Sequence, residues 1–215
     1  MKKIYGLIAA IAVIISIFST SSFVSYASNK TADGIAIDGE YLITDNDGMH
    51  TRYVLIAKNI SGKDLSVMAK FHAQKVDGNH IKSVTDGTAA VKNGQSFMLY
   101  GQFKNDDIEE AGGFSYEISS EETDSCMYDA IGLDVKTGTD SALTITGTNY
   151  SSEDVACVNV RSVFLKNGTP VAFDTVNIGD CAYSLRSGSS NTQDLGILVP
   201  EYDDYIVTYS VANEL

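Results

Sequence analysis

The pattern of the stretch Tyr53-Val-Leu-Ile-Ala-Lys-Asn59-Ile-Ser61-Gly-Lys-Asp64 returns 90 positions further along the chain. Without a gap it aligns with Leu143-Thr-Ile-Thr-Gly-Thr-Asn149-Tyr-Ser151-Ser-Glu-Asp154, and the alignment continues from Asp77-Gly78 to Asn167-Gly168. The few identities fall where backbone geometry is demanding, since Asn-x-Ser opens a turn and Asp-Gly or Asn-Gly forms a hairpin. A repeat at a fixed period of this size indicates a supersecondary unit copied in tandem.

Outward from this stretch, short runs of alternating apolar and polar residues recur about every ten positions, as in a β-sandwich. The first copy predicts strands near residues 35–44, 51–59, 64–76, 80–91, 95–104 and 113–119. The second predicts strands near residues 130–136, 142–149, 154–166, 170–178, 181–186, 192–199 and 204–213. The chain has only two prolines and keeps no helical period. The sequence therefore predicts an all-β protein of two tandem sandwich domains, residues 28–122 and 123–215.

The hairpin dipeptide of the first copy predicts a strand register. If Asp77-Gly78 is a two-residue loop, Val76 faces Asn79 and Phe71 faces Val84. Side chains alternate along a strand, so one face then carries the core residues Leu65, Val67, Ala69 and Phe71.

In the second copy, Asn167-Gly168 predicts Phe164 opposite Val171 and the charged pair Arg161 opposite Asp174. The predicted core face is Val158, Val160, Phe164, Val171 and Phe173. The alternation of core residues along these strands is offset by one position from that of the first copy, and this offset predicts a β-bulge in one of the long strands.

Between the copies, the polar run Ser119–Ser125 predicts a linker or exposed loop, with the domain boundary near Glu122. The other long charged insertion, residues 105–113, predicts a solvated loop.

The N-terminus has the pattern of a secretion signal, residues 1–27. Lys2 and Lys3 precede the apolar run Ile4–Phe18, and Ser25-Tyr26-Ala27 offers a cleavage site. An uncleaved anchor is the alternative, although the apolar run is shorter than the roughly 20 residues of a spanning helix. Residues 1–27 hold two lysines and no acid, so cleavage takes the net charge from −13 to −15. This charge argues against nucleic acid and anionic lipid surfaces as partners, and it predicts a secreted, extracellular chain without a membrane contact.

Three cysteines, Cys126, Cys157 and Cys181, are an odd number for an exported chain. Cys157 aligns with Val67 of the first copy, which favours a small buried hydrophobe over a disulfide. A disulfide between Cys157 and Cys181 is the alternative, and it would need Cα atoms within about 7 Å. We expect three free thiols, which a thiol count on denatured, unreduced protein would test.

The plan of each copy resembles the FxLYD domains, small β-sandwich modules of secreted bacterial proteins. The matching features of the first copy are Asn59/Ser61, Phe71, Asp77-Gly78 and Asn93-Gly94. Those of the second copy are Asn149/Ser151, Val163-Phe164, Asn167-Gly168 and Gly188. The name-giving motif departs from the family, because Ala73, Gln74 and Lys75 replace its Leu, Tyr and Asp, and Arg161 replaces the Phe of the second copy. The resemblance implies immunoglobulin-like sandwiches and an extracellular, non-enzymatic module, and it carries over no functional residues.

Catalytic and zinc sites find little support in the residue pattern. The three histidines, His50, His72 and His80, all lie in the first copy, where each is expected to face solvent. A Cys-His arrangement with Cys157 or Cys181 would have to span both domains. The sequence contains no Cys-x-x-Cys and no His-x-x-x-His. We therefore predict no catalytic residues, no cofactor and no metal.

Two further patterns offer candidate ligand sites. Asp45-x-Asp47-Gly48 resembles the start of a calcium loop, but Met49 and Ile56 stand where ligands would follow, so a hairpin turn is favoured. The acidic cluster Glu201, Asp203 and Asp204 has the same interpretation. A sugar-binding surface formed by Tyr202, Tyr205 and Tyr209 is less favoured than burial of these rings beside Val207.

The sequence thus favours a non-enzymatic binding or spacer module that recognises a protein or a cell-envelope component. The alternative is a secreted hydrolase with its site in the cleft between the domains. A deep polar cleft lined by His72 or His80 and carboxylates would favour the hydrolase.

Overall fold

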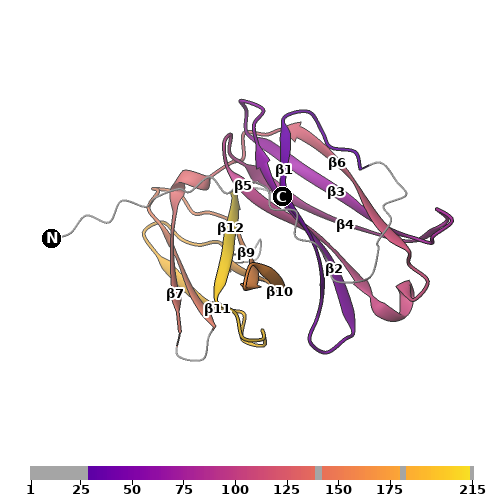
Figure 1. Cartoon of the computed structure of the whole chain (residues 1–215). Helices are drawn as coiled ribbons and strands as arrows, with labels where there is room; N and C mark the ends of the chain where they lie inside the picture. The colour runs from indigo at the N-terminus through magenta and orange to yellow at the C-terminus, as the bar shows by residue number, and fades with distance from the viewer. Residues whose placement is uncertain (1–28, 139–141, 180–182, 214–215) are drawn as a thin grey trace.

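The computed structural model describes residues 29–138, 142–179 and 183–213, so the predicted signal lies outside the described residues. The described chain is all-β, as predicted (Figure 1). In the first half, residues 29–122, the strands are β1 (Ile35–Thr44), β2 (His50–Asn59), β3 (Leu65–Gln74), β4 (His80–Val91), β5 (Ser96–Lys104) and β6 (Gly113–Glu122). In the second half, residues 123–213, they are β7 (Ile131–Thr137), β8 (Leu143–Asn149), β9 (Cys157–Lys166), β10 (Thr169–Gly179), β11 (Ser190–Leu195) and β12 (Asp204–Ala212). The short 3₁₀ helices η1 (Asn105–Ile108) and η2 (Tyr128–Ala130) complete the described elements.

The strands form four antiparallel sheets of three strands each. The first half contains the sheets β1-β2-β5 and β4-β3-β6, and the second half contains β7-β8-β11 and β10-β9-β12. Each strand of the second half thus holds the place of the strand six positions earlier. The repeat seen in the sequence is a repeat of strand order.

The two sheets of the first half pack face to face over one hydrophobic core. Its β3 residues are Leu65, Val67, Ala69, Phe71 and Ala73, each at most 5% exposed. The predicted core stripe Leu65–Phe71 is therefore confirmed. Phe97, Leu99 and Phe103 of β5 face it from the other sheet, so the core lies between the two layers.

The second half has its own core, with Val158, Val160 and Phe164 of β9 as predicted. Val171 is partly buried against this core. The prediction that Phe173 belongs to this core is wrong, because Phe173 lies on the opposite face of β10 in a third cluster described below. The error follows from a bulge that the sequence did not locate.

The Asp77-Gly78 hairpin is one residue longer than the predicted two-residue loop. The amide of Lys75 donates to the Asn79 carbonyl at 2.8 Å, which leaves Val76, Asp77 and Gly78 in the loop. Val76 therefore does not face Asn79. An irregularity between Ala73 and Gln74 restores the register, so Phe71 does pair with Val84 as predicted.

The Asn167-Gly168 hairpin is a two-residue loop, since Lys166 pairs with Thr169. A bulge follows between Pro170 and Ala172, and it shifts every later pair by one residue. Phe164 consequently pairs with Ala172 and Arg161 with Thr175, so both predicted partners, Val171 and Asp174, were wrong. The expected β-bulge itself is present.

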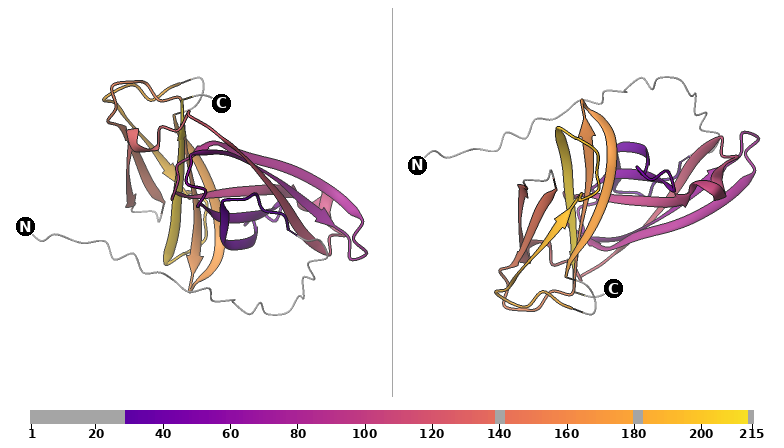
Figure 2. Two further views of the ribbon diagram at one scale, coloured as in Figure 1. Left: turned by 90° about the horizontal axis from the view of Figure 1, so that it is seen from above. Right: turned by 90° about the horizontal axis from the view of Figure 1, so that it is seen from below.

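A third hydrophobic cluster joins the two halves. Val54, Ile56 and Met98 on the outer face of sheet β1-β2-β5 pack with Val163, Leu165 and Phe173 on the outer face of sheet β10-β9-β12. The outer faces of these two sheets therefore pack against each other, and Figure 2 shows the strands of the first half crossing those of the second at a steep angle. Sheets covered on both faces need strands that are apolar on both faces. This explains the uninterrupted burial of Tyr53–Ala57 and of Val160–Leu165.

Several predicted segments need correction, and the strand predicted over 192–199 ends at Leu195. Residues 183–186 contain an isolated bridge from Leu185 to Val155 where a strand was predicted, and residues 181 and 182 lie outside the described residues. Residues 119–122 belong to β6, so the linker predicted over 119–125 is shorter. The 105–113 insertion begins with η1, and none of the η1 residues is buried.

Candidate functional site at the junction of the two halves

The Asn-x-Ser turns form the same buried hydrogen-bond network in both halves. Asn59 and Asn149 are both 0% exposed. The Asn59 amide donates to the carbonyls of Lys63 and Val91 at 2.8 and 3.0 Å, while its oxygen accepts from the Ser61 amide and hydroxyl. Asn149 repeats these bonds with Glu153, Leu185 and Ser151. Each asparagine therefore pairs backbone groups that would otherwise be buried alone at one end of its sandwich.

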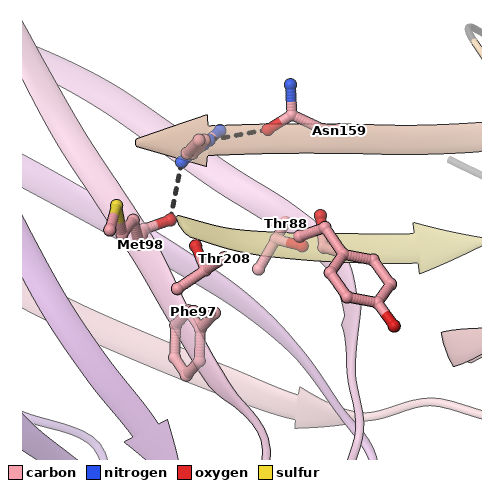
Figure 3. Close-up of a pocket in the computed structure, with 8 residues that line it drawn as sticks. Thr88, Phe97, Met98, Asn159 and Thr208 are labelled. Carbon is pink, nitrogen blue, oxygen red and sulfur yellow. Dashed lines mark hydrogen bonds between the residues drawn. The ribbon is translucent and has the colours of Figure 1, made fainter. Parts of the chain in front are cut away.

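Next to this end, an ion pair crosses between the halves. Arg161 of β9 donates from both terminal nitrogens to Asp86 of β4, at 2.5 and 3.0 Å, with side chains 11% and 16% exposed. Its remaining donors reach the Met98 carbonyl and the Asn159 side chain at 2.7 Å each (Figure 3). The Tyr100 ring lies 5.0 Å from the guanidinium, close enough for a cation–π contact. Arg161 is thus a structural clamp rather than a free charge.

Little open space remains around the Arg161–Asp86 clamp in the contact region between the two halves, which we call the joint. The cavity lined by Thr88, Phe97, Met98, Arg161 and Thr208 measures about 10 Å³, close to the room needed by one water. Beside it, the Gln95 side-chain amide donates to the Tyr209 carbonyl at 2.5 Å. The part of the joint around Arg161 is therefore closed by side chains.

A larger concavity opens at the edge of the joint, where the chain passes from one half to the other. We call it the junction groove, a space of about 360 Å³. The residues that line it are Asp64, Lys92, Cys126, Met127, Tyr128, Asp129, Ala130, Tyr150 and Ser151. They come from the two turns beside Asn59, from the connection through η2 and from the Asn149 turn.

None of the three histidines lines the junction groove or the small space around Arg161. His72 occupies the face of β3 opposite Phe71, and both His72 Nδ1 and His80 Nε2 hydrogen-bond to the Ser83 hydroxyl, at 2.7 and 2.6 Å. Burial lowers the pKa of His72, and nearby Lys70 acts in the same direction while Glu117 opposes it. His80 is exposed as expected, whereas His50 and His72 are partly buried.

The Asp45–Gly48 segment forms the predicted turn, with the Asp45 amide bonded to the His50 carbonyl at 2.9 Å. Asp45, Asp47 and His50 offer three ligand atoms close together. However, the Arg52 guanidinium already pairs with Asp45, and the Asp47 carboxylate accepts from the Met49 amide at 2.8 Å. Both carboxylates therefore make contacts that stabilise the turn.

The C-terminal tyrosines are used in packing. Tyr202, Tyr205 and Tyr209 are partly buried against the second core, together with Val207. In the nearby acidic cluster, Asp203 accepts from the Asn167 amide and so holds the hairpin turn. The predicted burial of these rings is confirmed in part, because all three are partly buried against the second core.

Cys157 is half-buried at the start of β9, paired with Ala212, and it is not part of the second core. Val158 takes the core position, because the chain between Val155 and Val158 gains a residue relative to the first half. Cys126 is half-buried in the junction groove, and burial raises the pKa of its thiol. Cys181 lies outside the described residues, so the thiol count stays a prediction.

Sequence reasoning missed the joint, the clamp and the groove. The available signal was the continuous apolar run Tyr53–Ala57, which differs from the alternating run Leu65–Gln74 and indicates burial on both faces. The Arg161–Asp86 pair had no local signal, because its members lie 75 residues apart.

Comparison with known proteins identifies no family. No family model matches the chain, and no curated protein matches it. Among solved structures 53 chains match, including red sea bream transglutaminase, with 11% identity and a TM-score of 0.28 over 86% of this chain and 30% of that one. Another is a β-glucuronidase from glycoside hydrolase family 2, with 14% identity and a TM-score of 0.19 over 78% and 20%. The chain spans less than a third of either structure, and likenesses this weak carry no argument about activity. Within the described ranges, no helix has the length and apolarity to cross a membrane.

Proposed function

We propose that this chain is an extracellular, non-enzymatic binding or spacer module of two tandem immunoglobulin-like sandwiches, which recognises a protein or cell-envelope component. The signal-like pattern of residues 1–27 and the resemblance of each copy to FxLYD domains support this proposal. The high negative charge suits a soluble, non-aggregating chain outside the cell.

The observation that carries the proposal is the closed joint. A shared apolar cluster and the buried Arg161–Asp86 clamp hold the halves at one angle. A fixed angle presents the loops of both halves as one surface, which suits recognition, and it sets a constant length, which suits a spacer.

The alternative, a hydrolase with its site between the domains, would need a polar cleft at this joint. The space around Arg161 is about 10 Å³, and the larger junction groove at the edge of the joint has carboxylates but neither His72 nor His80 in its lining. The geometry therefore favours the binding or spacer role over this alternative.

A retention experiment tests the proposal. The chain from residue 29 onward is immobilised and exposed separately to insoluble envelope polysaccharide and to secreted proteins, with an unrelated protein of equal charge as control. Retention of one fraction above the control is the expected result. Release of reducing ends or peptides from the bound material would favour the hydrolase, and retention of neither fraction would contradict a binding role.

A further inference from the structure

The junction groove is a formed concavity whose walls come from both halves. Its volume of about 360 Å³ falls within the roughly 300–1,000 Å³ typical of small-ligand sites. Its position depends on the closed joint, because Asp64 and Lys92 belong to the first half while Tyr128 and Tyr150 belong to the second.

Two tyrosines in the groove are held in place. Tyr150 is 75% exposed, and its Cε2 atom would lie 2.5 Å from a Cβ at Gly132, so the ring rests where only glycine leaves room. Tyr128 stacks on Tyr209, with ring centroids 4.5 Å apart and planes inclined by 19°. Tyr150 therefore presents an exposed ring above Gly132, and the partly buried Tyr128 ring is supported by Tyr209.

The polar groups around these rings combine donors and acceptors. Lys92 is paired with Asp129, and the Asp64 carboxylate accepts from the Asn93 amide at 2.8 Å. The charges are two carboxylates and one ammonium, so the groove does not suit an anion. Carboxylates and an ammonium beside aromatic rings match an uncharged ligand with many hydroxyls, whose apolar ring faces can stack on tyrosine.

A peptide strand fits the groove less well, because the backbone around it is already paired. The Tyr150 amide donates to the Ala130 carbonyl at 2.8 Å, and the Met127 amide donates to the Val211 carbonyl at 3.1 Å. The backbone of Cys126 also pairs with that of Ala212 in an isolated antiparallel β-bridge. Strand addition requires free backbone groups, so saccharide recognition by side chains is favoured.

We propose that the junction groove binds sugar rings of an uncharged envelope glycan, with Tyr150 as the stacking platform and Asp129, Lys92 and Asp64 as hydrogen-bonding groups. This inference rests on the proposed binding function and names its ligand class. It places the site at different tyrosines from the Tyr202, Tyr205 and Tyr209 surface, whose rings pack against the second core.

The test compares Tyr150→Ile with the wild-type chain, because isoleucine is the residue of the equivalent turn in the first half. Ile60 is 59% exposed in that turn, so Tyr150→Ile should fold. Ile60→Ala is the matched control outside the groove. The probes are soluble tetrasaccharides of glucose, N-acetylglucosamine and mannose, titrated into ¹⁵N-labelled chain, together with retention on insoluble envelope polysaccharide.

The expected result is chemical-shift change at Tyr128, Asp129 and Tyr150 with at least one tetrasaccharide. Tyr150→Ile should raise the Kd about tenfold, and Ile60→Ala should leave it within about twofold. Polysaccharide retention that is equal for wild type and Tyr150→Ile would overturn the groove while leaving the binding function standing. Groove shifts produced by secreted proteins but by no saccharide would overturn the ligand class. Retention of nothing by the wild-type chain would overturn both proposals.

Discussion

At the residue scale, stability concentrates in a few buried polar side chains. Asn59 and Asn149 occur in equivalent turns and make equivalent bonds, although the sequences around them have diverged. A buried backbone carbonyl needs a donor, and asparagine supplies two donors and an acceptor within a short reach. This requirement explains why the Asn-x-Ser pattern is the most legible part of the repeat.

Asn59→Asp should lower the free energy of unfolding by about 2–5 kcal/mol, because aspartate keeps the shape but cannot donate to the Lys63 and Val91 carbonyls. Denaturant unfolding measures the loss. The control is Asn93→Ala on the neighbouring exposed turn, which should cost less than about 1 kcal/mol. Equal effects of the two substitutions would contradict the role given to Asn59.

His72 should make stability depend on pH near neutrality. Burial lowers its folded-state pKa below the unfolded value of about 6.5, so the unfolded chain takes up the proton more readily. The free energy of unfolding should therefore fall as pH drops through about 6.5 toward the folded-state pKa. His72→Gln should remove this component, as denaturant titrations at pH 7.5, 6.5 and 5.5 would show. Parallel profiles for wild type and variant would contradict it.

At the scale of the secondary-structure elements, the sequence predicted the positions of the hairpins but not those of the bulges. The turn dipeptides marked both hairpins, because Asp, Asn and Gly tolerate the backbone conformations that tight turns require. The bulge at Val171 depends on which side chains of β10 can be buried on each face, and that is set by packing. A single extra residue moved Phe173 from the predicted core to the joint.

Gly168→Ala should cost about 1–2 kcal/mol, because Gly168 has φ of 76° and a Cβ there would meet no other atom within 4 Å. The cost is therefore one of backbone conformation alone. Asn167, with φ of 51°, is the matched control. Asn167→Gly should change stability by less than about 1 kcal/mol, and thermal unfolding of both variants checks the contrast.

At the scale of the whole molecule, the layered joint makes the chain one unit of four sheets. The inner sheets β1-β2-β5 and β10-β9-β12 are buried on both faces, whereas the outer two each have a free face. Burying seven apolar side chains at the joint adds stability that neither half has alone. The Arg161–Asp86 clamp then selects one relative orientation.

Asp86→Ala should destabilise the protein by about 2–5 kcal/mol, because it leaves the Arg161 charge enclosed without its partner. Adding Arg161→Met should recover part of the loss, since removing both charges avoids the unpaired one. Glu117→Ala, which breaks an exposed pair with Lys30, should leave the unfolding midpoint nearly unchanged. A loss that the double variant does not reduce would argue against the clamp.

Separate halves cut near Glu122 should each fold, because each has its own core. Each should also be less stable than in the intact chain, since Val54, Ile56 and Met98 or their partners become exposed. Mixing the halves should restore association, which analytical ultracentrifugation would detect. Loss of cooperative unfolding in both halves would mean that they share a single core.

The sequence by itself determined the all-β class, most strand bounds, both hairpin positions and the two Asn-x-Ser turns. These features depend on backbone preferences and on residues a few positions apart, so they can be read locally. Only the tertiary structure shows the register beyond Pro170, the burial of Phe173 between the two halves, the partner of Arg161 and the junction groove. Each depends on which residues come into contact across two sheets. Asp86 and Arg161, for example, are 75 positions apart, so the sequence pattern around either residue does not predict their contact.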